Sequence, residues 1–148
     1  MSKILELKFK PSESQLKTIL SVTDSPNFPW FVVYQNSKKL GEAQEFYLSH
    51  GLRSRYEEEE PVAGVINSSI CEEFEDIFLQ ICADNGVEVN TIFRSNLNLT
   101  THIPKKYGWV HTDHEFEHRN FILYLNDFTN GPTYVFDDDG DLIKEVSA

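Results

Sequence analysis

His111 and Asp113 are the two residues whose types and spacing best fit metal chemistry. In an extended strand the side-chain direction repeats every two residues, so both side chains point to one face and Thr112 to the other. An imidazole nitrogen and a carboxylate oxygen are two of the three ligands of the 2-His-1-carboxylate triad, which leaves positions on iron(II) open. A solvated polar strand end carries the same residues, so the interpretation depends on the neighbouring motifs.

The neighbouring residues form an ordered series of motifs. An apolar run with one tyrosine, a turn, a short β-type run and an acidic turn follow Asp113. They occupy residues 120–126, 127–132, 133–136 and 139–140. Together with Arg94-Ser-Asn96-Leu97 and Phe28-Pro-Trp30 upstream, this series resembles the iron(II)- and 2-oxoglutarate-dependent oxygenases, in particular the small prolyl-hydroxylase-like branch of bacteria and phages. The resemblance spans residues 28–140.

The resemblance implies a dioxygenase on a double-stranded β-helix, the cupin-like jelly roll, in the α+β or mainly β class. His111 and Asp113 would bind iron(II), 2-oxoglutarate would be the co-substrate, and ascorbate an accessory reductant. Tyr124 would donate its hydroxyl to a 2-oxoglutarate carboxylate; a core tyrosine bonded to the backbone is the alternative. Arg94 and Asn96 would line the same cavity, although a solvent-facing arginine fits equally well. The substrate would be peptidyl proline, a free amino acid or another small molecule.

The sequence departs from the family near its end. In the family a second histidine ligand follows the aspartate well downstream, with an Arg or Lys beyond it that pairs with 2-oxoglutarate. Here His114 and His118 are the only later histidines, and we expect both at the surface or at the mouth of the site. The chain is then an oxygenase fragment without its last strands, a protein that takes its third ligand from another histidine, a water or a second chain, or a metal-free binding module.

As given, the chain is expected to bind iron weakly and to turn over 2-oxoglutarate slowly or not at all. A metal-dependent hydrolase is a weaker alternative, because the sequence has no His-Glu-x-x-His motif.

Composition restricts the class of protein and of partner. A length of 148 residues with 40% hydrophobic content fits one domain, in which residues 1–88 support the first jelly-roll strands in residues 89–148. A net charge of −11 argues against nucleic-acid backbones and anionic membranes as partners. Without an apolar run of membrane length or a signal peptide, a cytoplasmic protein is expected. Exposed sheet edges would favour a homo-oligomer.

Periodicity and turn residues predict the elements that position the site. A short helix should begin after Ser12, with Gln15 as its capping-box partner, and end near residues 24–26. The main helix should span residues 69–85, capped by Ser68 or Ser69 and stopped by Gly86. Cys71 and Cys82 should be buried, reduced thiols on that helix. Strands are predicted at residues 4–9, 28–34, 44–48, 89–99, 108–112, 119–126, 133–136 and 142–146, and a charged loop at 51–61.

Overall fold

The computed structural model describes residues 4–34, 46–55, 62–100, 111–114, 116–129, 131–137 and 139–146. Within them the chain is a mixed α/β structure with two helices and two antiparallel sheets. The elements are α1 (Glu13–Thr23), β1 (Phe31–Tyr34), β2 (Phe46–Ser54), β3 (Val65–Ile66), α2 (Cys71–Asp84), β4 (Ser95–Leu99), β5 (Thr133–Phe136) and β6 (Leu142–Val146).

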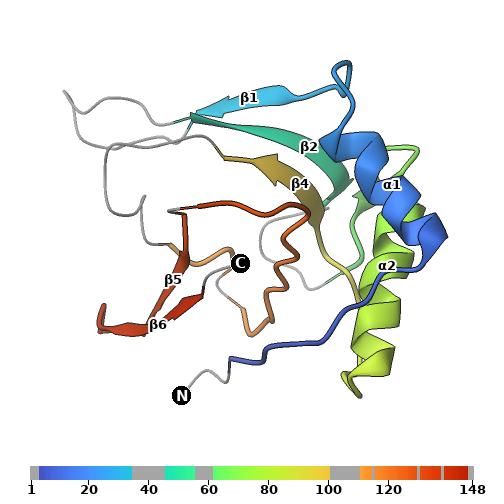
Figure 1. Cartoon of the computed structure of the whole chain (residues 1–148). Coiled ribbons are helices and arrows are strands. Elements are labelled where there is room, and N and C mark those ends of the chain that lie inside the picture. The colour runs from blue at the N-terminus through green and yellow to red at the C-terminus, as the bar shows by residue number, and fades with distance from the viewer. Residues whose placement is uncertain are drawn as a thin grey trace.

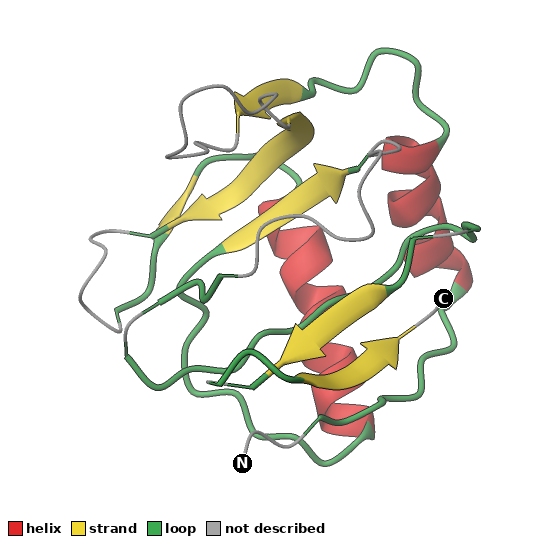
Figure 2. Ribbon diagram, turned by 90° about the vertical axis from the view of Figure 1, so that its left-hand side faces the viewer, coloured by secondary structure: helices red, strands yellow, loops and turns green. Residues whose placement is uncertain are grey.

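The larger sheet is organised around β2. Its first half pairs with β1, from Phe31 opposite Ser49 to Tyr34 opposite Phe46, and its end pairs with β3. Strand β4 pairs antiparallel with β2 as well, and the register shifts between Gly51 and Arg53. Both helices lie on the same side of this sheet (Figures 1 and 2). Neither helix covers the other face of this sheet.

The hydrophobic core fills the space between the helices and the larger sheet. Its buried members come from both helices, β2 and β4: Ile19, Val22, Leu52, Cys71, Phe74, Ile77, Ile81 and Leu97. Cys71 and Cys82 are buried and unbridged on α2, as the sequence predicted. Burial raises the pKa of both thiols, most directly by desolvating the thiolate form.

The helix ends follow local sequence signals in three of the four cases predicted, including the end of α1 at Thr23 with Asp24 as its C-cap. Ser12 caps α1, accepting from Gln15 N at 3.2 Å while Gln15 Oε1 accepts from Ser12 N, which confirms the capping box. At the end of α2, Gly86 has φ +67 and donates to Ala83 O, and Val87 donates to Cys82 O. This pair of bonds is the Schellman arrangement, so Gly86 stops the helix as predicted.

The predicted serine cap of α2 is wrong. The N-cap residue is Ile70, and it makes no side-chain capping bond. Ser68 Oγ instead faces His50 Nε2 at 2.8 Å, while His50 Nδ1 lies 3.0 Å from Pro29 O. Because a carbonyl can only accept, Nδ1 carries a proton and donates to Pro29. His50 thus ties β2 to two neighbouring segments.

Residues 4–9 do not form the predicted strand. The alternation is partly right, since Leu7 and Phe9 pack against the core and Leu5 is exposed. The backbone partner, however, is a side chain: Lys8 N donates to Asn85 Oδ1 and Asn85 Nδ2 donates to Lys8 O. This segment is extended, but its hydrogen-bond partner is one side-chain amide at the end of α2. Without a neighbouring strand it forms no ladder of backbone hydrogen bonds.

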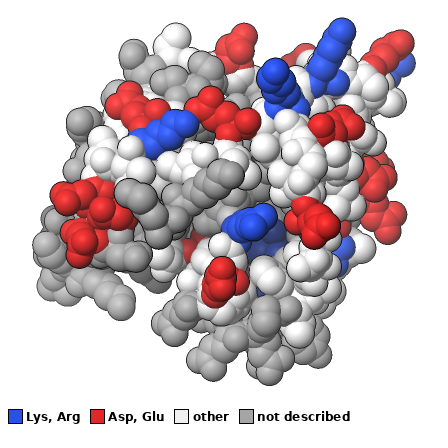
Figure 3. Space-filling model, turned by 90° about the horizontal axis from the view of Figure 1, so that it is seen from below, with Lys and Arg blue, Asp and Glu red and all other residues white. Residues whose placement is uncertain are grey.

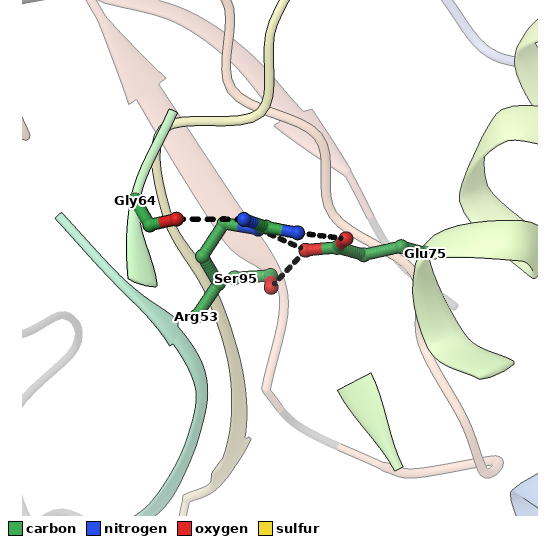
Figure 4. A network of polar contacts seen from close by, with 4 residues as sticks. All are labelled: Arg53, Gly64, Glu75 and Ser95. Carbon is green, nitrogen blue, oxygen red and sulfur yellow. Dashed lines mark hydrogen bonds and ion pairs between the residues drawn. The ribbon is translucent and has the colours of Figure 1, made fainter. Parts of the chain in front are cut away.

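The predicted charged loop at 51–61 is wrong for its first part, where β2 continues to Ser54. Leu52 is in the core, and Arg53 is held by a network that joins β2, α2 and β4 (Figure 4). Arg53 Nε and Nη2 each donate to the Glu75 carboxylate at 2.7 Å, and Nη1 donates to Gly64 O at 2.7 Å. The sequence suggested a solvated charge because the partner lies 22 residues away. The rest of the predicted loop, residues 56–61, lies outside the described part of the chain.

The second half of the chain contains fewer strands than predicted. Residues 89–94 are irregular, and only β4 forms in the predicted strand at 89–99. Residues 108–110 lie outside the described residues, and 111–112 are not in a strand. Residues 119–126 form no strand either, although Leu123 and Leu125 pack against the core. Their side-chain alternation is present, but a strand also needs a neighbouring backbone to complete its hydrogen bonds.

The hairpin β5–β6 matches the predicted strands and acidic turn. Asp137 Oδ1 accepts from Asp139 N and Asp141 N, and Gly140 adopts φ +85, which closes the turn. No helix in the described part of the chain is both long and apolar enough to cross a membrane.

Candidate functional site

The direction of the residues around the start of β4 is set by a contact with α2. Ser95 Oγ donates to Glu75 Oε1 at 3.0 Å, and Leu97 is buried in the core. Ser95 therefore faces α2 (Figure 4), and Leu97, two residues further along β4, faces the same side. By the two-residue alternation of a strand, Arg94 and Asn96 face the opposite side.

Arg94 and Asn96 contact each other on that opposite face. With the Asn96 amide turned so that its nitrogen donates to Ser95 O, its oxygen accepts from Arg94 Nε at 2.6 Å and Nη2 at 2.8 Å. The third guanidinium nitrogen, Nη1, lies 4.0 Å from Asp113 Oδ1. The structure therefore brings Arg94 to Asp113, and Asn96 contacts Arg94 and not the aspartate.

His111 and Asp113 also lie close together. His111 Nε2 is 3.8 Å from Asp113 Oδ1, the same oxygen that faces Arg94. The His111 side chain is 60% exposed and that of Asp113 is 35% exposed. The two side chains thus converge as the spacing predicted, although residues 111–113 lie in an irregular segment and not in a strand.

Arg55 holds the backbone of this segment. Its Nη1 donates to Asp113 O at 3.2 Å from just beyond the end of β2. Arg55 lies in the predicted charged loop, and no local pattern indicates this contact because it spans 58 residues. Two arginines, Arg55 just after β2 and Arg94 just before β4, thus lie beside one aspartate.

His114 and His118 belong to an aromatic cluster next to the site. The His114 ring stacks on Phe116 with ring centroids 4.7 Å apart and meets His118 edge-on at 4.8 Å. His114 Nδ1 is buried without a hydrogen-bond partner. Desolvation first, and then the neighbouring His118, lower the pKa of His114, which favours the neutral ring at neutral pH. His114 is half-buried, so the expected position at the surface or at the mouth of the site stays a prediction.

Tyr124 extends from the irregular segment that precedes β5. Its hydroxyl lies 2.5 Å from Thr133 Oγ1, and its ring meets Phe128 at 5.1 Å between centroids. Its neighbours Leu123 and Leu125 pack against the core, so Tyr124 points away from the helices. The alternation predicted for this tyrosine is present. Its partner is a side-chain hydroxyl and not the backbone.

The donor types at His111 and Asp113 suit iron(II), which accepts imidazole and carboxylate ligands. Two donors bound at right angles to one first-row ion at about 2.1 Å lie about 3.0 Å apart. The observed 3.8 Å can reach this separation by a small rotation of the exposed His111 side chain. Among the described residues no group of three His, Cys, Asp or Glu side chains is arranged to hold a metal. The pair fits as two ligands of an incomplete set.

No protein-family model, curated protein sequence or solved structure matches the chain.

The surface charge is mixed on the lower face of the molecule as it is oriented in Figure 1, which Figure 3 shows from below. Acidic side chains are spread over the described part of this face, with lysine and arginine side chains between them (Figure 3). This distribution accompanies the net charge of −11 of the whole sequence.

Proposed function

We propose that this chain is an iron(II)- and 2-oxoglutarate-dependent dioxygenase, or part of one, acting on a small molecule or on a peptide such as one containing proline. The observation that supports the proposal most is the approach of His111 Nε2 to Asp113 Oδ1, from two side chains that match the family's motif. Arg94, a further residue of the motif series, lies at the same aspartate, and Asn96 of that series binds Arg94.

In this proposal His111 and Asp113 would hold the iron, which supplies the oxidative chemistry when it is bound with 2-oxoglutarate. The tasks of the remaining residues are orientation and exclusion of water. Arg55 holds the backbone at Asp113, and the rings of His114, Phe116 and Phe93 provide an apolar wall beside it. A neutral His114 in this wall adds no charge beside the metal.

Tyr124 would bind a carboxylate of 2-oxoglutarate through its hydroxyl proton. That role requires Thr133 to be the donor in the 2.5 Å contact, so that the phenolic proton remains available to the ligand. A hydroxyl can donate one hydrogen and still accept another, so the pair can be arranged in this way.

The proposed architecture is a cupin-like jelly roll. The larger sheet supported by α1 and α2, together with the β5–β6 hairpin, would belong to it. A cytoplasmic location is part of the same proposal.

A non-catalytic binding module on the same fold is the second candidate. It is favoured by the finding that the described residues include no third metal-binding side chain near His111 and Asp113. In such a module the contacts of Arg55 and Arg94 with Asp113 would only stabilise the fold.

Consumption of 2-oxoglutarate with added iron(II) and ascorbate separates the two candidates. The oxygenase proposal predicts slow release of succinate that Asp113→Asn abolishes. Asp24→Asn, the same substitution at the exposed C-cap of α1, should leave the rate unchanged. Equal succinate release by the wild type and Asp113→Asn would contradict the proposal and favour the binding module.

A further inference from the structure

Asp113 Oδ1 has two neighbours of different kinds. The neutral or protonated imidazole of His111 lies 3.8 Å away, and the permanent cation of Arg94 lies 4.0 Å away. A distance of 4.0 Å is long for a hydrogen bond but short for a Coulombic contact. Arg94 therefore acts on Asp113 mainly through its charge.

Arg94 is held in this position by Asn96 and not by the aspartate. Nε and Nη2 both donate to the Asn96 amide oxygen, at 2.6 and 2.8 Å. Asn96 in turn lies in β4, whose register with β2 places it opposite Gly51. The guanidinium would thus stay beside Oδ1 when the aspartate binds another cation.

We propose that Arg94 is a positioning residue that sets the metal affinity of the His111–Asp113 pair, by holding a competing positive charge at the oxygen that would bind the metal. This inference rests on the proposed function. A divalent ion bound to Oδ1 lies close to the guanidinium, and like charges repel. Arg94 then keeps binding weak and reversible, so that the metal is retained only when further ligands complete its coordination.

The size of the effect follows from Coulomb's law in partly solvated surroundings. The Arg94 side chain is 32% exposed, so solvent screens its charge only in part, and the dielectric constant of water gives the smallest effect to expect. A double and a single charge about 6 Å apart in water repel enough to weaken binding about ten-fold. Salt should reduce this effect, because exposed charges are screened.

The test is titration with Mn²⁺ alone, in which electron paramagnetic resonance measures the free ion. Arg94→Gln keeps an amide donor for Asn96 but removes the charge, and it should bind Mn²⁺ about ten-fold more tightly than the wild type at low salt. Arg94→Lys keeps the charge and should bind as the wild type does. The gain of Arg94→Gln should shrink in high salt.

Asp113→Asn separates failure of the inference from failure of the proposed function. It should remove the tight component in the Arg94→Gln background, while thermal unfolding shows that each variant is folded. Binding that depends on Asp113 but is unchanged or weaker in Arg94→Gln would overturn the inference alone, and would mean that Arg94 organises the carboxylate. Binding that does not depend on Asp113 in any background would overturn the metal site, and the inference with it.

Discussion

Arg53 and Glu75 form a two-pronged ion pair between β2 and α2, with Nε and Nη2 each 2.7 Å from a carboxylate oxygen. Both side chains are largely buried, so removing one partner leaves an uncompensated charge. We expect Glu75→Gln to lower the free energy of unfolding by about 3 kcal/mol. Denaturant unfolding followed by circular dichroism measures this change.

The exposed pair between Glu13 and Lys17 on α1 provides the matched control. Lys17→Gln should cost less than about 0.5 kcal/mol, because solvent screens an exposed pair. If Glu75→Gln were as mild as this control, the Arg53 network would not hold α2 against the sheet.

Acid should weaken the same network. The guanidinium of Arg53 lowers the pKa of Glu75 below its ordinary value of 4.5. A carboxylate whose pKa is lower in the folded state adds stability that is complete above the ordinary value and is lost as the pH falls through the lowered one. The wild type should therefore lose more unfolding free energy between neutral and acid pH than the double variant Arg53→Met, Glu75→Leu. Parallel pH profiles for the two proteins would argue against an ionised Glu75.

Gly64 lies where three backbone segments meet. A Cβ atom at this position would be 2.1 Å from Ser54 O and 2.4 Å from Phe93 O, and neither backbone atom can move aside as a side chain could. Gly64→Ala should destabilise the protein by about 3 kcal/mol or more. Gly51→Ala, where the nearest atom is the Asn96 side chain at 3.7 Å, is the control with little change. Thermal unfolding compares the two variants, and equal melting temperatures would refute the close approach.

The Tyr124–Thr133 contact predicts a division of roles between two hydroxyl groups. Tyr124→Phe should weaken 2-oxoglutarate binding about ten- to hundred-fold, because a hydrogen bond to a charged carboxylate is worth roughly 1.5–3 kcal/mol. Thr133→Val should weaken it less, and Thr133→Ser should restore it, since serine keeps the donor. Calorimetric titration of the iron-loaded protein measures all three. An unchanged affinity in Tyr124→Phe would leave the tyrosine with only a structural role.

Local signals in the sequence were sufficient for elements whose partners are close in the chain. The Ser12 capping box, the Gly86 stop and the β5–β6 hairpin depend on residues within a few positions of one another, and all three formed as predicted. The side-chain direction was also predictable where no strand formed, as at Tyr124 between Leu123 and Leu125.

Contacts between distant residues were not predictable in the same way. Arg53 was predicted in a loop because its partner Glu75 lies on another element. Lys8 was predicted in a strand, but its backbone binds the side chain of Asn85 and not a neighbouring strand. The approach of Arg94 to Asp113 depends on how β4 lies against the irregular segment at 111–114, which periodicity does not encode. The sequence motifs suggested that Arg94 and Asp113 belong to one site, but only the fold shows how close they are.

The most direct test of the account is the anaerobic absorption spectrum of the protein with iron(II) and 2-oxoglutarate. If His111 and Asp113 hold iron that is chelated by 2-oxoglutarate, a visible charge-transfer band should develop at high metal concentration. It should disappear in both His111→Ala and Asp113→Asn and persist in the control Asp24→Asn. A band equally strong in all four proteins, or no band in the wild type at saturating iron, would contradict the proposed site.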